Sequence, residues 1–318
     1  MSMLSSRAAV ASALAAAGPA GISGEAIASA IGISRVAVSK HVASLRVLGY
    51  EVRSAPRAGY VLVHAPDACI PEEVAPRLRD PLWVACEGAP EIGSTNDEAK
   101  RLARAGAAEG TAVVAACQTG GRGRLGRVWE SPAGGAYVSC VLRPSLAPAQ
   151  MAPLSLALAL GAARALEPLG VDVALKWPND LEYDGRKLGG LLLEMAAEAD
   201  RTEWVIAGCG VNVSEPGLPG SAWVREAAPD ALAAAVAAAL LDGMAGAYRS
   251  FVRDGFGVLR EEFEARASLT GREVTVRDAA GVVVDEGVVR GVAEDGSLLL
   301  QRDGDTVRVS AGAVTLRG

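Results

Sequence analysis

Histidine is almost missing from this sequence, which contains only His41 and His64. A histidine-based metal site or a Ser-His-Asp triad therefore has little to be built from. The five cysteines are scattered, odd in number and never spaced Cys-x-x-Cys, a pattern typical of reduced, buried thiols. No Gly-x-x-x-x-Gly-Lys-Ser/Thr phosphate loop is present. No uninterrupted apolar run reaches the roughly 18–20 residues of a membrane span, so we expect no membrane partner and a cytoplasmic location.

Charge is distributed unevenly along the chain. Residues 1–64 carry six Lys/Arg and two Asp/Glu, a net charge of +4, whereas the other 254 residues have a net charge of −10. A basic N-terminal segment on an acidic body predicts a nucleic-acid contact confined to one end. The 318 residues leave room for two or three domains, and half of them are hydrophobic, enough for sizeable cores.

The first 64 residues are predicted to form a winged helix. Two helices around a tight glycine-containing turn, followed by a β-hairpin, are its signature. We expect helices over 4–17, 23–31 and 35–48, and strands over 50–53 and 59–63. A protein–protein module is the alternative, but the helix, the hairpin and the positive charge together favour DNA binding. The residues expected to contact DNA are Arg35, Ser39, Lys40 and His41 of the third helix and Arg53 and Arg57 of the hairpin.

The rest of the chain is predicted to divide into three parts, which makes the protein an α+β multidomain chain. Residues 65–80, rich in proline and charge, are expected to be a linker. Residues 81–268 read as a mixed α/β domain, whose last long helix breaks near Gly255. Residues 269–318 contain five short strands separated by turns, which suits a small SH3-like β-barrel.

Residues 121–129 combine three glycines, three arginines and a tryptophan, and we call them the Gly/Arg loop. Glycine destabilises helices, but it lets backbone approach a ligand, and guanidinium groups pair with phosphate or carboxylate. The glycines match the Gly-x-Gly-x-x-Gly dinucleotide fingerprint, which requires a strand before it and a helix after it. A strand is expected over 111–117, but Ser131-Pro132-Ala133-Gly134-Gly135 follows the loop, so we reject that interpretation.

Three other clusters in the central part are unusual for a plain core. They are Ser94-Thr95-Asn96, Lys176-Trp177-Pro178-Asn179-Asp180 with Lys187, and Gly208-Cys209-Gly210-Val211-Asn212. Each has a simpler interpretation, respectively a helix cap or capping box from Thr95 to Glu98, a type I turn and strand glycines. Together they indicate a pocket with several cations and no enzyme nucleophile. Such a pocket suits the condensation of a carboxylate with the α-phosphate of a nucleotide, with magnesium offsetting the charge.

Four motifs, in this order, resemble those of biotin–protein ligases. They are Gly-Arg-Gly-Arg-x-Gly-Arg-x-Trp, Lys-Trp-Pro-Asn-Asp, Arg-Lys-Leu-Gly-Gly-Leu-Leu-Leu-Glu and Gly-x-Gly-Val-Asn-Val. The resemblance covers roughly residues 83–318, and the N-terminal segment is similar to the biotin operon repressor branch of the family. It implies a class II synthetase-like central domain that makes biotinyl-5′-AMP from biotin and ATP with Mg²⁺. The biotin then passes to a lysine of a carrier protein, and this lysine is the nucleophile.

The resemblance also implies roles for individual residues. The residues that would hold the biotin ring are Ser94, Thr95, Asn96 and Gln118. Arg122, Gly123 and Arg124 would lie over the biotin carboxylate and the phosphate, and Lys187 would neutralise the junction between them. The residues on the ATP side would be Arg122, Arg124, Trp129, Lys176 and Asn212. Asp180 would orient Lys187 or hold Mg²⁺.

Two alternatives to a bifunctional ligase and repressor remain open. One is a transcription factor that senses biotinyl-AMP and has weak or no ligase activity, but an intact Gly/Arg loop and Lys187 argue against it. The other is a lipoate ligase of related fold, which the two most specific motifs disfavour. Repression implies operator DNA and a homodimer induced by the adenylate. Edge strands near 187–195 and 137–142 are the expected dimer surface.

Overall fold

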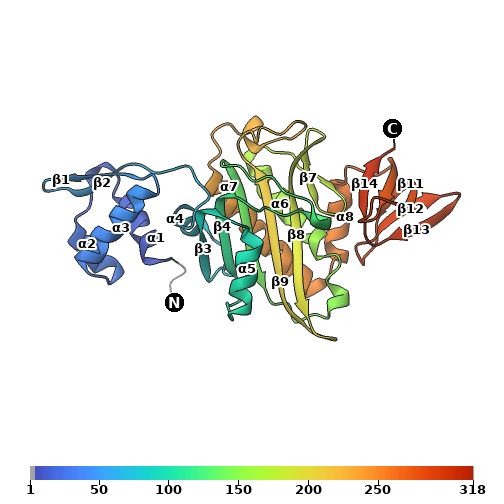
Figure 1. Cartoon of the computed structure of the whole chain (residues 1–318), viewed down its shortest axis with the longest axis horizontal. Helices are drawn as coiled ribbons and strands as arrows, with labels where there is room; N and C mark the ends of the chain where they lie inside the picture. The colour runs from blue at the N-terminus through green and yellow to red at the C-terminus, as the bar shows by residue number, and fades with distance from the viewer. Residues whose placement is uncertain (1–3, 318) are drawn as a thin grey trace.

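The computed structural model describes residues 4–317; residues 1–3 and 318, the outer ends of the first and last predicted domains, lie outside the described residues. The chain is elongated, with a helical module at one end, a large mixed sheet in the middle and a small sheet at the other end (Figure 1). None of the helices in this described part combines the length and hydrophobicity that a membrane span requires.

The N-terminal module is a winged helix, as predicted. Its elements are α1 (Ser6–Ala17), α2 (Gly24–Ile31), α3 (Arg35–Val47), β1 (Glu51–Ala55) and β2 (Gly59–His64). The Oγ atom of Ser34 accepts a hydrogen bond from the amide of Ala37 at 3.1 Å, so Ser34 caps α3 as expected. Gly32 ends α2 in the left-handed conformation, with φ 71°, which makes the tight turn between the two helices.

The predicted linker is packed against both of its neighbours. Its short helix α4 (Pro71–Val74) carries two buried carboxylates, Glu72 and Glu73. Glu72 pairs with Arg7 of α1 at 2.6 Å, and Glu73 accepts a hydrogen bond from the Tyr50 hydroxyl at 2.5 Å. Burial, together with the hydrogen bond to Glu73, raises the pKa of Tyr50. The winged helix is therefore held to the linker by buried polar contacts as well as by chain connectivity.

The central domain is a seven-stranded sheet in the order β3-β4-β5-β9-β8-β7-β6, in which only β3 and β4 are parallel. Its strands are β3 (Ala85–Ile92), β4 (Thr111–Gln118), β5 (Gly135–Leu142), β6 (Ala174–Lys176), β7 (Asp180–Tyr183), β8 (Arg186–Ala197) and β9 (Thr202–Asn212). Its helices are α5 (Thr95–Arg104), α6 (Leu154–Leu166), α7 (Ala233–Asp254) and α8 (Gly257–Ala265). Short 3-10 turns lie at Gly18–Ala20, Ala75–Arg77, Arg124–Gly126, Pro148–Gln150, Glu167–Leu169 and Val224–Glu226.

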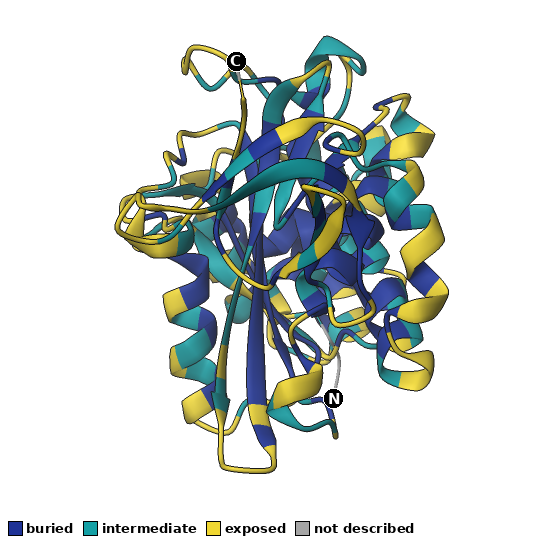
Figure 2. Ribbon diagram, turned by 90° about the vertical axis from the view of Figure 1, so that its right-hand side faces the viewer, coloured by how far each residue is buried: buried dark blue, intermediate teal, exposed yellow. Residues whose placement is uncertain are grey.

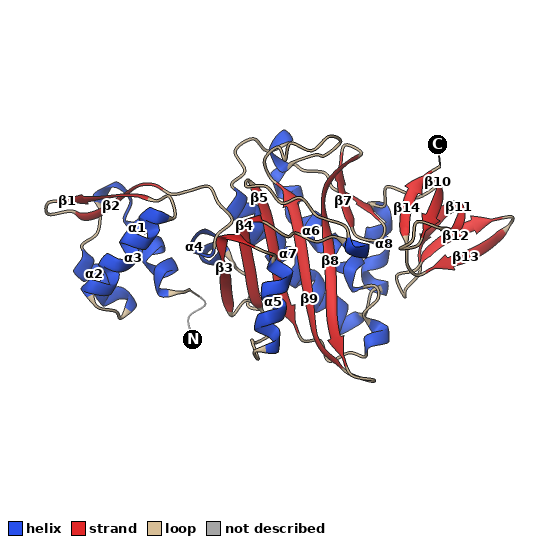
Figure 3. Ribbon diagram, in the orientation of Figure 1, coloured by secondary structure: helices blue, strands red, loops and turns tan. Residues whose placement is uncertain are grey.

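The two faces of this sheet are covered differently. Helices α6 and α7 pack on one face and bury the largest core, while α5 crosses the other face over a smaller apolar cluster (Figure 3). The central strands β5 and β9 are almost continuously buried, whereas exposed residues gather in the loops at the ends of the sheet (Figure 2). Fully apolar strand segments such as Ala112–Ala115 follow from this double coverage.

The structure corrects two of the sequence-based expectations for the central domain and confirms a third. Strands β5 and β8, both expected to be edges, lie inside the sheet, β5 between β4 and β9 and β8 between β9 and β7. Strand β5 therefore offers no free edge for dimerisation, and β8 lacks a neighbour on its β7 side only beyond Gly190. Helix α5 is capped by Ser94 and not by Thr95, because the Thr95 hydroxyl lies against Gln118. The break in the last long helix is confirmed, since α7 ends at Asp254 and α8 begins at Gly257.

The C-terminal domain is a five-stranded antiparallel sheet. Its strands are β10 (Glu273–Arg277), β11 (Val283–Val292), β12 (Leu298–Arg302), β13 (Asp305–Val309) and β14 (Ala313–Leu316). The order is β13-β12-β11-β10-β14, and the outer strands do not pair with each other, so the described sheet is not a closed barrel. It packs on the central domain, where the Trp177 indole donates to the carbonyl oxygen of Gly296 at 2.9 Å.

Close packing of α6 on α7 gives a stability prediction. A Cβ atom on Gly161 would lie 2.4 Å from the backbone oxygen of Gly243, so Gly161→Ala should destabilise the central domain by about 1–3 kcal/mol. Urea unfolding followed by tryptophan fluorescence measures this, because all five tryptophans lie between residues 83 and 223. Gly246→Ala in α7 is the matched control, since its Cβ would meet nothing within 4 Å. Equal midpoints for the two variants would contradict this account.

Candidate active site

A cavity of about 320 Å³ lies over the middle strands of the central sheet and beneath the Gly/Arg loop. Eleven of the twelve residues predicted to contact ligand or metal line it. They are Ser94, Thr95, Asn96, Gln118, Arg122, Gly123, Arg124, Trp129, Lys176, Asp180 and Lys187. Four clusters that lie far apart in the sequence are therefore brought to one place.

The Gly/Arg loop folds back on itself above this cavity. The amide of Gly123 donates to the carbonyl oxygen of Arg127 at 2.8 Å, and the amide of Trp129 donates to that of Gly121 at 3.0 Å. A Cβ atom on Gly121 would lie 2.3 Å from the Trp129 oxygen, so glycine is required where the two arms meet. Strand β5 follows the loop, with no helix between them. This confirms that the Gly/Arg loop is not the strand–loop–helix unit that binds dinucleotides.

Two cations lie at one side of the cavity. The Lys187 ammonium pairs with Asp180 Oδ1 at 2.7 Å and lies 5.1 Å from the centre of the Trp129 ring. The Arg124 guanidinium lies 3.4 Å from Asn179 Oδ1, and burial lowers its pKa from the ordinary arginine value. Because arginine titrates so far above neutrality, Arg124 stays charged while partly removed from water. Lys176 is paired with Glu182 at 3.1 Å.

The opposite side of the cavity is lined by uncharged polar groups. Gln118 Oε1 accepts hydrogen bonds from the amide and the hydroxyl of Thr95, at 2.8 and 3.1 Å. The Asn96 side chain is buried over Gly208, where a Cβ atom would lie 2.1 Å from Asn96 Oδ1. Asn96 Oδ1 also lies 2.7 Å from the hydroxyl of the fully buried Ser139. The strand glycine therefore makes room for an amide, as its position inside an apolar strand suggested.

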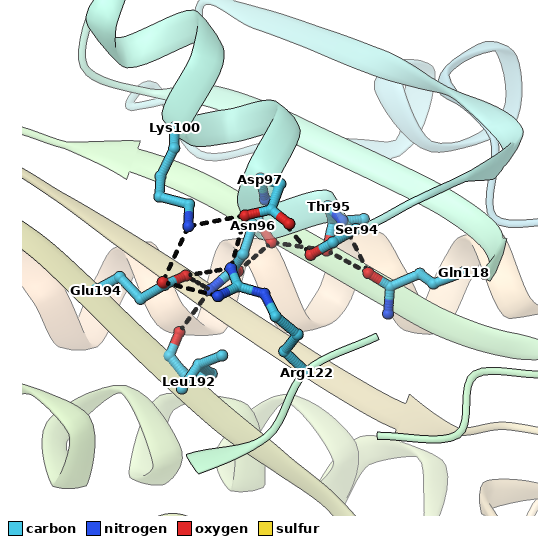
Figure 4. Close-up of polar contacts among 10 residues, drawn as sticks. Ser94, Thr95, Asn96, Asp97, Lys100, Gln118, Arg122, Leu192 and Glu194 are labelled. Carbon is cyan, nitrogen blue, oxygen red and sulfur yellow. Dashed lines mark hydrogen bonds and ion pairs between the residues drawn. The ribbon is translucent and has the colours of Figure 1, made fainter. Parts of the chain in front are cut away.

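A carboxylate network borders this polar side (Figure 4). Glu194 accepts hydrogen bonds from Asn96, Lys100 and Arg122, and Arg122 also pairs with Asp97 at 2.7 Å. Burial opposes the ionisation of Glu194, but these three donors outweigh it, so the pKa of Glu194 is lowered. Asp97, Lys100 and Glu194 were missed by the sequence-based reasoning, although Glu194 is the charged end of the Arg-Lys-Leu-Gly-Gly-Leu-Leu-Leu-Glu motif.

Asn212 is the predicted residue that the structure does not bring to the cavity. Its side chain is buried and donates to the carbonyl oxygen of Ala222 at 3.1 Å. It thereby holds the segment 214–228, in which the amide of Ala222 donates to the Lys187 oxygen at 2.9 Å. Shortly after Ala222 the segment also reaches the interdomain linker, because Arg225 forms an ion pair with Asp67.

The C-terminal domain also lines the cavity, through Gly312, Ala313 and Val314. Nothing in the local sequence of this turn indicates a ligand site, so only the fold reveals it. Cys209 lies in the cavity floor, where burial raises its pKa to about 12 and leaves it a poor nucleophile. Among residues 4–317, no three His, Cys, Asp or Glu side chains are grouped as a metal site. The cavity can hold anions and polar rings, but it has no nucleophile of its own.

The predicted DNA-contacting residues lie on the winged helix, away from this cavity. Arg35, Ser39 and Lys40 are exposed on α3, and His41 is half-buried beside them. Arg53 and Arg57 are exposed on the hairpin. Arg35 is weakly engaged, 3.6 Å from Glu25 with both side chains largely exposed, so it remains accessible to another anion.

Comparison with known proteins agrees with this arrangement. Three family models match: an HTH domain over residues 7–61, the biotin/lipoate A/B protein ligase family over 89–212, and the biotin protein ligase C-terminal domain over 269–317. The bifunctional ligase/repressor BirA of Bacillus subtilis is 34% identical over 93% of this chain and 94% of its own length. The chain belongs to the bifunctional biotin–protein ligase/repressor family. BirA of Escherichia coli is 32% identical over 93% of the chain and 92% of its own.

Solved structures of biotin ligases match about three quarters of this family member. The biotin protein ligase from Aquifex aeolicus in complex with biotin and ATP gives a TM-score of 0.62 at 28% identity. It covers 73% of this chain and 98% of its own length. The apo structure of the same enzyme gives 0.60 at 25% identity, covering 74% of this chain and 100% of its own.

The lowered pKa of Glu194 predicts a pH dependence of stability. A carboxylate with a depressed folded-state pKa stabilises the fold above its unfolded pKa, and this stabilisation is lost as the pH falls through the folded value. Glu194→Gln should therefore be less stable than wild type at about pH 7, and the difference should shrink below the ordinary value of 4.5. Urea unfolding by tryptophan fluorescence between about pH 7 and pH 3 measures it. A difference that stays constant with pH would contradict the ion-pair network.

Proposed function

We propose that this protein activates biotin with ATP, transfers it to a carrier lysine and represses transcription through its winged helix. The arrangement that supports this most directly is the cavity in which Arg124 and Lys187 converge without an enzyme nucleophile. A triad hydrolase is inconsistent with that composition. Relatives named bifunctional ligase/repressor, similar over 93% of the chain, support both halves of the function.

The chemistry follows from two anions held together. An oxygen of the biotin carboxylate attacks the α-phosphorus of ATP, a new oxygen–phosphorus bond forms, and pyrophosphate leaves with the electron pair of the broken bond. The amine of the carrier lysine then attacks the acyl carbon, loses a proton and expels AMP. In both steps the enzyme contributes position and charge: Arg124 and Lys187 would offset the repulsion between carboxylate and phosphate and stabilise the charge that develops.

We assign the polar side of the cavity to the biotin ring. Ser94, Thr95, Asn96 and Gln118 present hydroxyl and amide groups, which match a ureido group that both donates and accepts hydrogen bonds. The loop residues Arg122 to Arg124 would close over the carboxylate and phosphate.

The nucleotide would lie on the other side of the cavity, beside Trp129 and Lys176. The Trp129 indole nitrogen is buried, and no side chain or backbone group in the described range accepts its hydrogen. It is therefore an unpaired donor, packed against Gly210, and a ligand would reach it only if the indole moved. The adenine contact of Asn212 remains a prediction, which would require segment 214–228 to move.

The cavity lining suits Mg²⁺ only if the phosphates of the nucleotide supply most of its ligands. Asp180 is the cavity carboxylate nearest the two cations, and it is shared with Lys187. Mg²⁺ is commonly bound by one or two carboxylates together with substrate phosphates. Asp180 would supply the protein ligand and the phosphates the others, and the ion would offset phosphate charge when bound.

The remaining structural assignments belong to the same proposal. We infer domains at 1–64, 81–268 and 269–318 with a linker at 65–80, a class II synthetase-like central domain, and an SH3-like relationship for the open C-terminal sheet.

We also propose that the adenylate promotes a homodimer, since a palindromic operator needs two winged helices. The free edge of β8 beyond Gly190, where β7 ends its pairing, would be the dimer surface.

Loss of Lys187 tests the ligase activity. Lys187→Ala should lower the rate of biotin- and ATP-dependent pyrophosphate release by about 10²–10³, because one charge facing the transition state is removed. Arg101→Ala, an exposed cation on α5 paired with Glu98, is the control and should retain the wild-type rate. Wild-type protein that is folded but releases no pyrophosphate would leave only the sensing alternative. Lipoate that replaces biotin in the same assay would favour a lipoate ligase.

The exposed cations of the winged helix give a prediction for DNA binding. With biotin and ATP present, the protein should bind its own promoter DNA, and Arg53→Ala should weaken binding and reduce the salt slope by about one. Arg290→Ala, an exposed arginine of the C-terminal sheet, is the control. Fluorescence anisotropy at several salt concentrations measures both quantities. Equal slopes for the Arg53 variant and wild type would mean that the hairpin does not touch the phosphates.

A further inference from the structure

One carboxylate outside the assigned ligand contacts joins both parts of the proposed biotin site. Glu194 Oε2 accepts hydrogen bonds from Asn96 Nδ2 and Arg122 Nη2, both at 2.9 Å, while Oε1 accepts one from Lys100 at 3.0 Å. These donors come from the start of α5 and from the Gly/Arg loop, whereas Glu194 stands on β8 (Figure 4). The strand and the loop are thus connected by a single side chain.

The contact with Arg122 is the one that governs the loop. Both terminal nitrogens of Arg122 reach Glu194, at 3.2 and 2.9 Å, which is a forked geometry with directional preference. The backbone of Arg122 also forms an antiparallel β-bridge with Val128 on the returning arm of the loop. A contact that fixes Arg122 therefore fixes both arms. Gly123 and Arg124 follow directly and are the part that overlies the cavity.

We propose that Glu194 is a positioning residue that holds the Gly/Arg loop closed over the acyl-adenylate through Arg122, and that couples this closure to the biotin-ring side through Asn96. The inference rests on the proposed function, because it requires an adenylate to retain. Glu194 itself does not line the cavity. Its effect on the reaction passes through the two side chains that it holds.

A purely structural role does not explain this arrangement as well. The side chains of Glu194 and Arg122 are 25% and 38% exposed, so their ion pair adds little to global stability. The same ion pair strongly favours the closed position of a glycine-rich loop, since such a loop makes few other contacts that oppose its opening.

The other carboxylate at Arg122 cannot replace Glu194. Asp97 is 55% exposed and bonds one guanidinium nitrogen, which Glu194 also engages. Asn96, by contrast, is 4% exposed and is fixed from behind by Ser139. Glu194 therefore connects the loop to Asn96, a buried side chain at the proposed position of the biotin ring, whereas Asp97 does not.

The test is a double-mutant cycle on adenylate release. Adenylate is formed on the enzyme from labelled biotin and ATP, and its dissociation is followed after a chase with unlabelled biotin. Glu194→Gln and Arg122→Ala should each raise the release rate about tenfold, and the double variant should release no faster than the faster single variant. The rate of pyrophosphate formation should change less than about threefold in Glu194→Gln. Tryptophan fluorescence at neutral pH should report a folded central domain throughout.

Two further variants keep the result interpretable. Glu198→Gln makes the same change at the exposed turn after β8 and should leave release at the wild-type rate. Glu194→Asp keeps the charge on a shorter side chain and should give intermediate release; it also replaces Glu194→Gln if that variant is unfolded. Wild-type release in both Glu194 variants, or rates that multiply in the double variant, would overturn the inference. Wild-type enzyme that forms no adenylate would instead overturn the proposed function on which it rests.

Discussion

Repulsion between a carboxylate and a phosphate is the constraint on which this structure depends. Two like charges about 4 Å apart repel each other strongly wherever water is scarce, so the site must supply positive charge in fixed positions. Lys187 stands on a strand and is aimed by Asp180, while Arg124 is brought by the loop. In the described chain Arg124 forms no ion pair with a carboxylate; burial lowers its pKa, and the charge of Asp180 opposes that effect in part.

The scaffold explains why such a site can be both tight and accessible. Strand glycines lower the cavity floor, so that Asn96 packs on Gly208 and the Trp129 indole on Gly210, where side chains would collide. The C-terminal sheet closes one wall and is itself tied to Trp177 through Gly296. Strands therefore supply one part of the polar groups, the start of α5 supplies a second part, and the Gly/Arg loop supplies the rest.

Sequence patterns predicted the features that depend on residues close together in the chain. The winged helix followed from caps and turns at Gly32 and Ser34, and the loop followed from its glycines and arginines. Features that depend on distant strands escaped: the interior place of β5, the open C-terminal sheet and the position of Glu194 all result from pairing order. Periodicity assigns a residue to a face of its own strand, but it does not say which strand lies beside it. What each cavity residue binds stays a prediction from resemblance.

Contacts continue from the cavity to the DNA-binding module. Segment 214–228 is held at Lys187 through Ala222, and its Arg225 is paired with Asp67 of the linker. The linker in turn meets the winged helix at Tyr50. A continuous chain of contacts alone does not transmit a signal; an element with two arrangements is also needed. Segment 214–228 contacts both the backbone of Lys187, a cavity residue, and the linker, so a change in the position of Arg225 would break or move its ion pair with Asp67. The position of a segment held at Lys187 therefore also bears on how the winged helix is attached.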